Sequence, residues 1–170
     1  MKILSSRLIL LWISFLIFGS CSQKQERLKA GEPAPLFTLK DPSGQTISLK
    51  QLSGKTILLH FWADWCADCR AEFPKLQAAY KKLKNHNFEI IAINVGQSRE
   101  HVQSFIESYH LTFFMAMDEN TDIAKLYHIK GLPTNYFLKP NLTIHKIIIG
   151  WVHDEQIRKI LSSIHEKEKK

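Results

Sequence analysis

Two cysteines separated by two residues are the most chemically suggestive feature of this sequence. Cys66 and Cys69 enclose Ala67 and Asp68, at the point where an apolar run gives way to a helical pattern. A thiol at a helix N-terminus faces free backbone N–H groups and the positive end of the helix dipole, and both favour the thiolate. Cys66 is therefore predicted to be a nucleophile. Cys69, one turn later, is close enough to attack a mixed disulfide on Cys66, so the pair predicts thiol-disulfide exchange with no cofactor beyond its own disulfide.

Two other kinds of chemistry could use the same pair. A zinc site would need a second pair of Cys or His ligands, and His60 is the only candidate nearby in the sequence, so we expect no metal. A purely structural disulfide between such close neighbours would close a very small loop and would add little stability. Redox exchange is the interpretation that the spacing favours.

A third cysteine, Cys21, follows a segment typical of export signals. Lys2 and Arg7 precede an apolar run over 8–18, which is about half the roughly 20 residues that a membrane-spanning helix needs. Two small residues stand directly before Cys21 and resemble the bacterial lipobox, in which the cysteine receives the lipid. We therefore predict a lipoprotein-type signal peptide over 1–21 and lipidation of Cys21. The alternative is a signal peptide cut nearby, with Cys21 incidental.

Composition and charge indicate one ordinary globular domain after this leader. The 170 residues are 45% hydrophobic and 23% charged, which excludes a disordered, collagen-like or multi-pass membrane chain. The net charge is +7, but the signs alternate and no basic stripe with interleaved aromatic residues occurs, so nucleic acid is not an expected partner. We expect a flexible tether over 22–32, a domain over 33–166, a frayed tail over 167–170, and a monomer.

The elements that must position the cysteines alternate between strand and helix patterns. Short alternating segments flank a turn signal and predict a hairpin, and near-continuous apolar runs predict strands buried on both faces. Together they indicate an α/β domain with a mixed sheet. The expected strands cover 36–40, 46–49, 56–62, 88–95, 135–138 and 144–150, and the expected helices follow Cys66 and Ser98, cover 118–127, and begin with Asp154 as cap.

Several motifs then resemble one family in their order along the chain. FWADWCADC is followed by an REFP-like stretch at 70–74 and by GLPT at 131–134, after a lead-in at 34–44 of the form APxFxLxDxxG. From about 31 to 161 the chain resembles the thioredoxin-fold oxidoreductases of the ResA/TlpA (redoxin) branch. The resemblance implies a thioredoxin-like mixed sheet flanked by helices, with an N-terminal β-hairpin extension. Asn94-Val95-Gly96 points to the ResA-like proteins, which are membrane-anchored thiol reductants of cytochrome c maturation.

The resemblance also implies roles for individual residues. Cys66 would be the exposed nucleophile and Cys69 the resolving thiol. Leu132-Pro133 would be a cis peptide that faces the disulfide, with Thr134 next to it, and the Leu132 backbone would pair with a substrate strand; the alternative is an ordinary trans proline. Trp65 would be a wall of the substrate site. Glu72 would take part in proton transfer and tune the thiols, unless it merely complements the helix dipole.

Three positions depart from the family pattern. Asp68 stands where relatives commonly carry Pro, and a carboxylate there disfavours a second negative charge, which would make the dithiol more reducing. Ala67 replaces an acidic residue and acts in the opposite direction. His60 occupies the strand position of the buried Asp of cytoplasmic thioredoxins, where it would either shuttle the Cys69 proton or sit as a neutral core histidine.

These observations lead to a functional expectation. We expect an extracytoplasmic, lipid-anchored thiol-disulfide oxidoreductase that acts mainly as a reductant. It would receive electrons from a membrane thiol donor and pass them to protein disulfides, among them that of apocytochrome c. One alternative is a peroxiredoxin-like peroxidase, although Ala63 stands where that class needs Thr or Ser. The other alternative is a redox-sensing or metal-carrying binding module. The direction of electron flow is not decided by the CxxC pattern.

Overall fold

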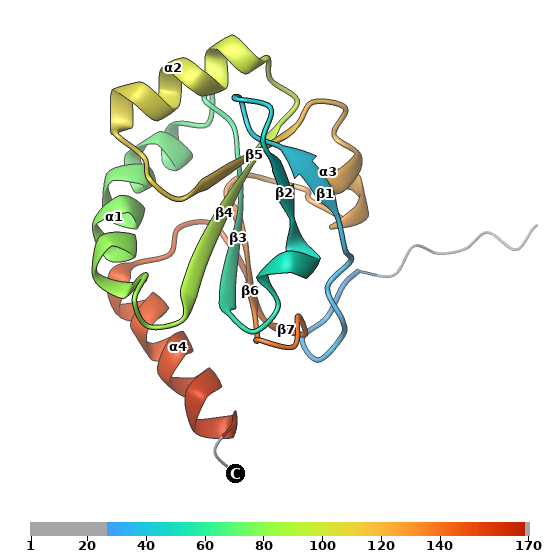
Figure 1. The fold of residues 1–170 in the computed structure, drawn as a ribbon, viewed down its shortest axis with the longest axis vertical. Coiled ribbons are helices and arrows are strands. Elements are labelled where there is room, and N and C mark those ends of the chain that lie inside the picture. Colours follow the sequence, from blue (N-terminus) through green and yellow to red (C-terminus); the bar gives the residue numbers. More distant parts are fainter. Residues whose placement is uncertain (1–26, 169–170) are drawn as a thin grey trace, which may run out of the picture.

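A single mixed sheet organises the domain. The computed structural model describes residues 27–168, without the side chains of the last two. The sheet has seven strands in the order β2-β1-β5-β4-β3-β6-β7 (Figure 1). The strands are β1 (Thr38–Lys40), β2 (Thr46–Ser48), β3 (Thr56–Trp62), β4 (Phe88–Val95), β5 (Phe114–Asp118), β6 (Thr134–Leu138) and β7 (Ile144–Ile149). The helices are η2 (Leu49–Leu52), α1 (Ala67–Leu83), α2 (Arg99–Tyr109), α3 (Asp122–Leu126) and α4 (Asp154–Glu168). This is the thioredoxin-like fold with an N-terminal hairpin that the resemblance implied.

The centre of the sheet is parallel and its flanks are antiparallel. β3 pairs with β4 and β4 with β5 in parallel, whereas β6 runs antiparallel to β3 and β7 antiparallel to β6. Every residue of β3 is buried, as its apolar run predicts for a strand covered on both faces. The carboxyl ends of β3, β4 and β5 therefore meet at one edge of the sheet, and α1 begins there.

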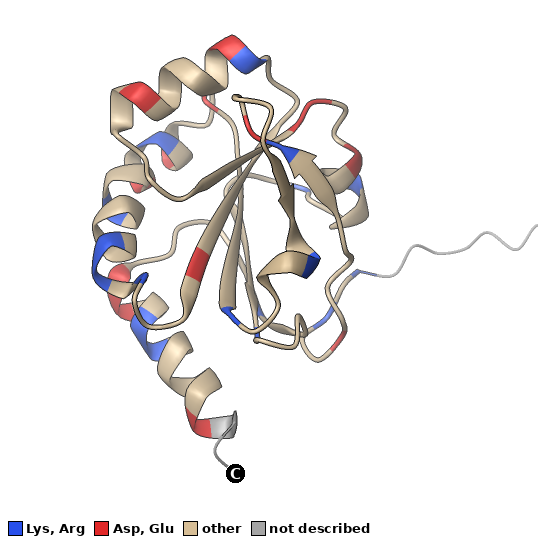
Figure 2. Cartoon of the chain, viewed as in Figure 1, with Lys and Arg blue, Asp and Glu red and all other residues tan. Residues whose placement is uncertain are grey.

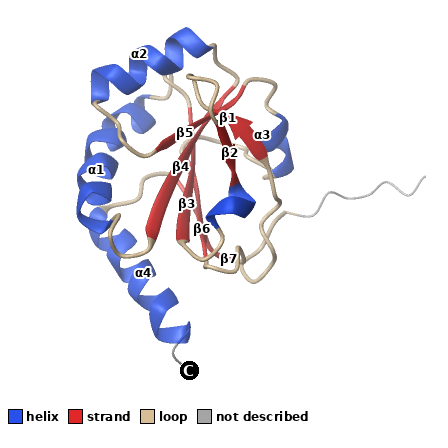
Figure 3. Ribbon diagram, in the orientation of Figure 1, coloured by secondary structure: helices blue, strands red, loops and turns tan. Residues whose placement is uncertain are grey.

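Two hydrophobic cores lie on opposite faces of this sheet, because neighbouring side chains of a strand point to opposite sides. One core joins Leu58 and Trp62 with side chains of α1, α2 and α4. The other joins Ile57, Leu59 and Phe61 with the hairpin region and α3. Figures 1 and 3 show the same division, with α1, α2 and α4 together on one side of the sheet.

The sequence pattern did not predict one of the strands, and the boundaries of several elements differ from those expected. Residues 114–118 form β5, although the sequence predicted a helix from 118 and no strand before it; α3 begins only at Asp122. The run at 113–117 is short and rich in Met, so periodicity could not assign it to a strand, and its pairing with β4 decided its structure. Asp154 is the first residue of α4 rather than its cap, and the helix continues to Glu168, into the expected tail.

Cys21 and the expected signal and lipidation segment lie outside the described residues. Within residues 27–168, none of the helices combines the length and apolar character required to span a bilayer. Charges of both signs are spread along α1, α2 and α4 (Figure 2), as expected of solvated helix faces.

Candidate functional site

The two cysteines form a disulfide at the start of α1. Cys66 is the N-cap of this helix, and its Sγ accepts a hydrogen bond from the Cys69 backbone N–H at 3.1 Å. Cys66 keeps 7% of its surface exposed, whereas Cys69 is fully buried. An incoming disulfide can therefore reach Cys66 and not Cys69. The sulfur of Cys66 also lies among the free N–H groups of the first helical turn, which stabilise a thiolate after reduction.

The loop before Cys66 is held by a side chain from another strand end. Gln97, just after β4, accepts a hydrogen bond from the Asp64 backbone N–H at 2.7 Å and donates its own amide to the Asp64 carboxylate. Asn94 donates to the same Gln97 oxygen at 2.7 Å, and Arg70 donates to the Asp64 carbonyl at 2.8 Å. These contacts position the loop that carries the nucleophile. Sequence reasoning missed Gln97, since only the fold brings it to Asp64.

His60 lies in β3, where the sequence placed it, and its protonation state follows from its partner. The Asn135 amide donates to the Gly150 carbonyl at 2.8 Å, so the Asn135 oxygen faces His60 Nδ1, also at 2.8 Å. Because that oxygen can only accept, Nδ1 carries the hydrogen and Nε2 holds a lone pair, which has no partner among the described residues. Burial lowers the pKa of His60 to about 4, with the Asn135 contact opposing it, so the ring is neutral at pH 7.

Glu72 is a buried carboxyl group on the same helix as the cysteines. It lies three residues after Cys69, hence on the same helix face. Its Oε1 accepts a hydrogen bond from the Val152 N–H at 2.8 Å, and its Oε2 has no partner among the described residues. Burial raises the pKa of Glu72 to about 7; Asp68 raises it further, whereas the Val152 contact and Lys75 lower it. At neutral pH this group can therefore both take up and release a proton.

The Leu132–Pro133 peptide bond is cis, as the resemblance implied. Thr134 begins β6 opposite Phe61, and its buried hydroxyl donates to the Gly131 carbonyl at 2.7 Å. The Thr134 side chain thus stabilises the cis-proline loop from its buried side. Leu132 and Trp65 line one depression next to the cysteine pair, and Trp65 is 68% exposed.

A short loop between β7 and α4 contacts Pro133, Asn135 and Glu72. Gly150 donates its N–H to the Pro133 carbonyl at 2.8 Å and accepts from Asn135, and Val152 binds Glu72. Gly150 has φ +96°, a conformation that favours glycine. Lys75 of α1 lies over the ring of the neighbouring Trp151, 4.6 Å from its centroid. The sequence identified Gly150 only as the end of a strand, so this connection was not foreseen.

The remaining candidates lie around the helix start or outside the described residues. Ala67 and Asp68 are exposed in the first turn of α1. Cys21 cannot be placed. In residues 27–168, no cluster of three or more His, Cys, Asp or Glu side chains is arranged to hold a metal ion.

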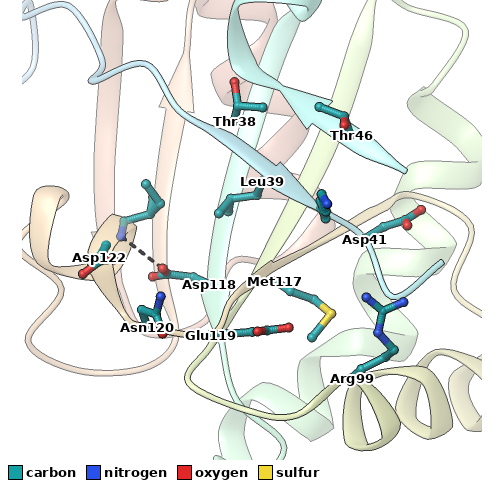
Figure 4. A pocket seen from close by; sticks show the side chains of 12 residues that line it. Thr38, Leu39, Asp41, Thr46, Arg99, Met117, Asp118, Glu119, Asn120 and Asp122 are labelled. Carbon is teal, nitrogen blue, oxygen red and sulfur yellow. Dashed lines mark hydrogen bonds between the residues drawn. The ribbon is translucent and has the colours of Figure 1, made fainter. Parts of the chain in front are cut away.

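A pocket of about 430 Å³ lies between the hairpin and the β5–α3 connection (Figure 4). Its most buried acid, Asp118, accepts hydrogen bonds from the backbone N–H groups of Ile123 at 3.1 Å and Ala124 at 2.7 Å, and thereby caps α3. Arg99, on its rim, donates to the Pro42 carbonyl. The pocket contains neither cysteine nor any other residue named for the exchange site. Asp118 therefore holds the start of α3, and Arg99 holds the turn of the hairpin.

Comparison with known proteins gives consistent matches. The AhpC/TSA family matches residues 30–147. The chain is 32% identical over 152 residues to the thiol-disulfide oxidoreductase ResA of Bacillus subtilis, which covers 89% of this chain and 85% of the relative. It is 34% identical over 169 residues to ResA of Oceanobacillus iheyensis, with 95% and 88% covered.

Solved structures show the same likeness. StoA of Bacillus subtilis is 30% identical with a TM-score of 0.66, covering 75% of this chain and 96% of StoA. The thioredoxin domain of a thiol-disulfide oxidoreductase from Bacteroides vulgatus is 25% identical with a TM-score of 0.72, covering 81% and 99%.

Proposed function

Because the chain belongs to the AhpC/TSA family and is a thiol-disulfide oxidoreductase of the thioredoxin fold, similar to ResA, we propose that it acts mainly as a reductant of protein disulfides outside the cytoplasm. The observation that carries this proposal is the division between the two sulfurs. Cys66 is accessible at the helix N-terminus, whereas Cys69 is buried one helical turn before a carboxyl group that can accept a proton near pH 7. An attacking thiol and a protected resolving thiol are what thiol-disulfide exchange requires, and the charge beside the pair supports the reducing direction.

The exchange proceeds in two steps. The Cys66 thiolate attacks one sulfur of the client disulfide, a mixed disulfide forms, and the other client sulfur leaves and takes up a proton. Cys69 then loses its proton and attacks the Cys66 sulfur, so the second client sulfur leaves as a thiol and the Cys66–Cys69 disulfide forms. Two electrons pass to the client, and a membrane thiol donor must return them for the next cycle.

Glu72 is the group proposed to accept the Cys69 proton. Its pKa of about 7 lets it hold or release a proton at physiological pH, whereas the pKa of His60, about 4, leaves the imidazole neutral there. His60 then contributes by orienting Asn135, and through it the loop at Gly150, rather than by storing a proton. We propose Trp65, Leu132 and the cis peptide at Pro133 as the surface that meets the client.

The reducing direction is supported by the charge beside the pair. Asp68 is an exposed carboxylate two residues after Cys66, and no lysine or arginine lies between the two cysteines. A negative charge there disfavours a thiolate on Cys66, and a less stable reduced form makes the dithiol a better donor. Ala67, which supplies no charge, does not add to this effect.

The location and client complete the proposal. We propose that residues 1–21 direct export, that a lipid on Cys21 holds the protein at the membrane surface, and that the residues after it tether the domain. The expected tether over 22–32 is too long at its C-terminal end, because Gly31 and Glu32 already form backbone hydrogen bonds with Ile144, each at 2.8 Å. A CxxCH disulfide of apocytochrome c is the proposed client, by analogy with the role that the resemblance implied. A lipid anchor would keep the domain close to a membrane-bound electron donor.

The reduction potential of the Cys66/Cys69 couple tests the proposed direction. The protein is equilibrated with glutathione or dithiothreitol buffers, and its free thiols are counted. A potential below about −200 mV is expected for a reductant, whereas a value near −120 mV, typical of a strong oxidase, would overturn the assignment. Reduction of an oxidised CxxCH peptide by the dithiol form tests the client class in the same samples.

A further inference from the structure

Two adjoining depressions extend from the cysteine pair across the cis-proline side of the domain. The first, of about 530 Å³, is lined by Trp65, Leu132 and neighbouring residues of α3 and its following loop. The second, of about 250 Å³, reaches Ile149 at the end of β7. His128 and Lys130 line both, so the two depressions share a wall. We call them together the basic groove.

The two ends of the basic groove expose large apolar side chains. Trp65 is 68% exposed and Ile149 is 72% exposed, and Leu132 lies half-buried between them. Exposed apolar side chains that line a depression next to a reactive group mark a place where another molecule gains by covering them. Trp65 directly precedes Cys66, so a polypeptide whose sulfur reaches Cys66 brings its flanking residues to this surface.

The charge of the basic groove has one sign. Its charged lining residues are Arg27, Lys125 and Lys130, and neither depression is lined by any Asp or Glu. Lys130 forms no ion pair within residues 27–168, whereas Lys125 pairs with the exposed Asp122 at 3.5 Å and donates to the Asn120 carbonyl at 3.2 Å. Exposed contacts of this kind hold a lysine weakly, so the Lys130 ammonium group is free for a partner and that of Lys125 can exchange its contacts for one.

Two other depressions of the domain lack this character. The pocket of Figure 4 combines Asp41, Asp118, Glu119 and Asp122 with Lys40 and Arg99. The depression on the other side of Trp65 contains Asp64 as well as Arg70. The depression on one side of Trp65 is therefore lined by charges of both signs, whereas the basic groove is lined by positive charges only.

We propose that the basic groove selects client polypeptides that carry acidic side chains among apolar ones next to the cysteine that is attacked. The proposal rests on the proposed function and specifies its substrate class. Lys130 stands two residues before Leu132, where it can pair with a carboxylate of a client chain that crosses the cis-proline loop. Trp65 and Ile149 then contact the apolar side chains of the same client. The chemistry is unchanged: the client disulfide is reduced to two thiols while Cys66 and Cys69 are oxidised to their disulfide.

The test compares three disulfide-bridged peptides that differ only in the residues flanking the cysteine pair: acidic, neutral amide or basic. The full-length protein in non-ionic detergent is reduced, and kcat/KM for each peptide is measured at low and high salt. We expect the acidic peptide to exceed the neutral one by about threefold to tenfold at low salt, and the preference to shrink with added salt.

Charge-reversal variants locate the effect. Lys125→Glu with Lys130→Glu should lower the acidic-to-neutral ratio to one or below. Lys84→Glu with Lys159→Glu changes the net charge equally at exposed positions outside the basic groove, so it should keep the wild-type ratio. All four positions are exposed, and thermal unfolding of each variant checks that the fold is retained.

The possible results distinguish failure of this inference from failure of the proposed function. Equal kcat/KM for the three peptides would overturn the inference while leaving the reductase function standing, whereas reduction of none of them would overturn the proposed function itself. A dimer in sedimentation that dissociates in the Lys125→Glu, Lys130→Glu variant would show that a second copy fills the basic groove. Selectivity that arises only after residues 22–26 are replaced by Gly and Ser would show that the chain's own N-terminal segment fills it. Either result would overturn the inference.

Discussion

Replacing Glu72 with glutamine should make the protein more resistant to alkaline pH and slower as a reductase. Burial raises the pKa of the Glu72 carboxyl group from 4.5 to about 7 in the folded protein. The unfolded chain therefore gives up this proton at a lower pH than the folded protein does. As a consequence, stability that is fully present below about pH 4.5 is lost as the pH rises toward 7, because the folded state must then hold a buried carboxylate.

The size of the effect follows from the two pKa values. Each tenfold difference in acidity is worth about 1.4 kcal/mol, so the difference between 4.5 and about 7 corresponds to about 3 kcal/mol. Glutamine has no such titration and keeps an oxygen for the Val152 N–H, while its NH₂ group replaces Oε2, which has no partner among the described residues. An unpaired amide costs about 1–3 kcal/mol at every pH. The pH-dependent part of the difference is therefore the informative quantity.

Chemical denaturation of the oxidised protein at several pH values measures that quantity. The free energy of unfolding of Glu72→Gln, relative to wild type, should rise by about 3 kcal/mol between pH 4.5 and pH 8. Glu166→Gln, at an exposed position of α4, should show no such rise. Disulfide reduction at pH 7 should fall about tenfold or more in Glu72→Gln, because the acceptor of the Cys69 proton is lost. A constant stability difference across this pH range would show that folding does not raise the pKa of Glu72.

Four further outcomes are expected. Cys69→Ala should accumulate a mixed disulfide between Cys66 and a client peptide, visible by mass spectrometry, whereas free turnover of this variant would show that Cys69 does not resolve the intermediate. Asp68→Asn should raise the reduction potential by about 10 mV, since an exposed charge contact is worth a few tenths of a kcal/mol; an unchanged potential would remove Asp68 from the account. His60→Asn should keep the wild-type pH profile of disulfide reduction above pH 5, because the imidazole is already neutral there, and a lost inflection would instead favour proton shuttling by His60. Cys21→Ser should release the protein from the membrane fraction and preserve reduction of a soluble disulfide, and loss of that activity would show that the three sulfurs have been assigned wrongly.

Sequence patterns alone predicted the features that depend on a single short segment of the chain. The CxxC pair at a strand-to-helix junction predicted the place and chemistry of the site, because helix N-termini and sulfur spacing are local properties. The GLPT motif was sufficient to predict the cis bond at Pro133, through the family resemblance alone. β5 was missed for the opposite reason. Its short apolar run is compatible with helix or strand, and only pairing with β4 and β1 selects the strand.

The properties of the site depended on contacts between distant segments. Glu72 was identified as a candidate, but its pKa near 7 arises from burial, which the hydrogen bond from Val152, 80 residues away in the chain, opposes only in part. Gln97 reaches Asp64 across 33 residues, and Asn135 reaches His60 across 75. Residue types and spacing determined that this chain exchanges disulfides. The tertiary structure decided which sulfur is accessible and which groups are neutral, because desolvation and hydrogen-bond geometry exist only once the sheet and helices have packed.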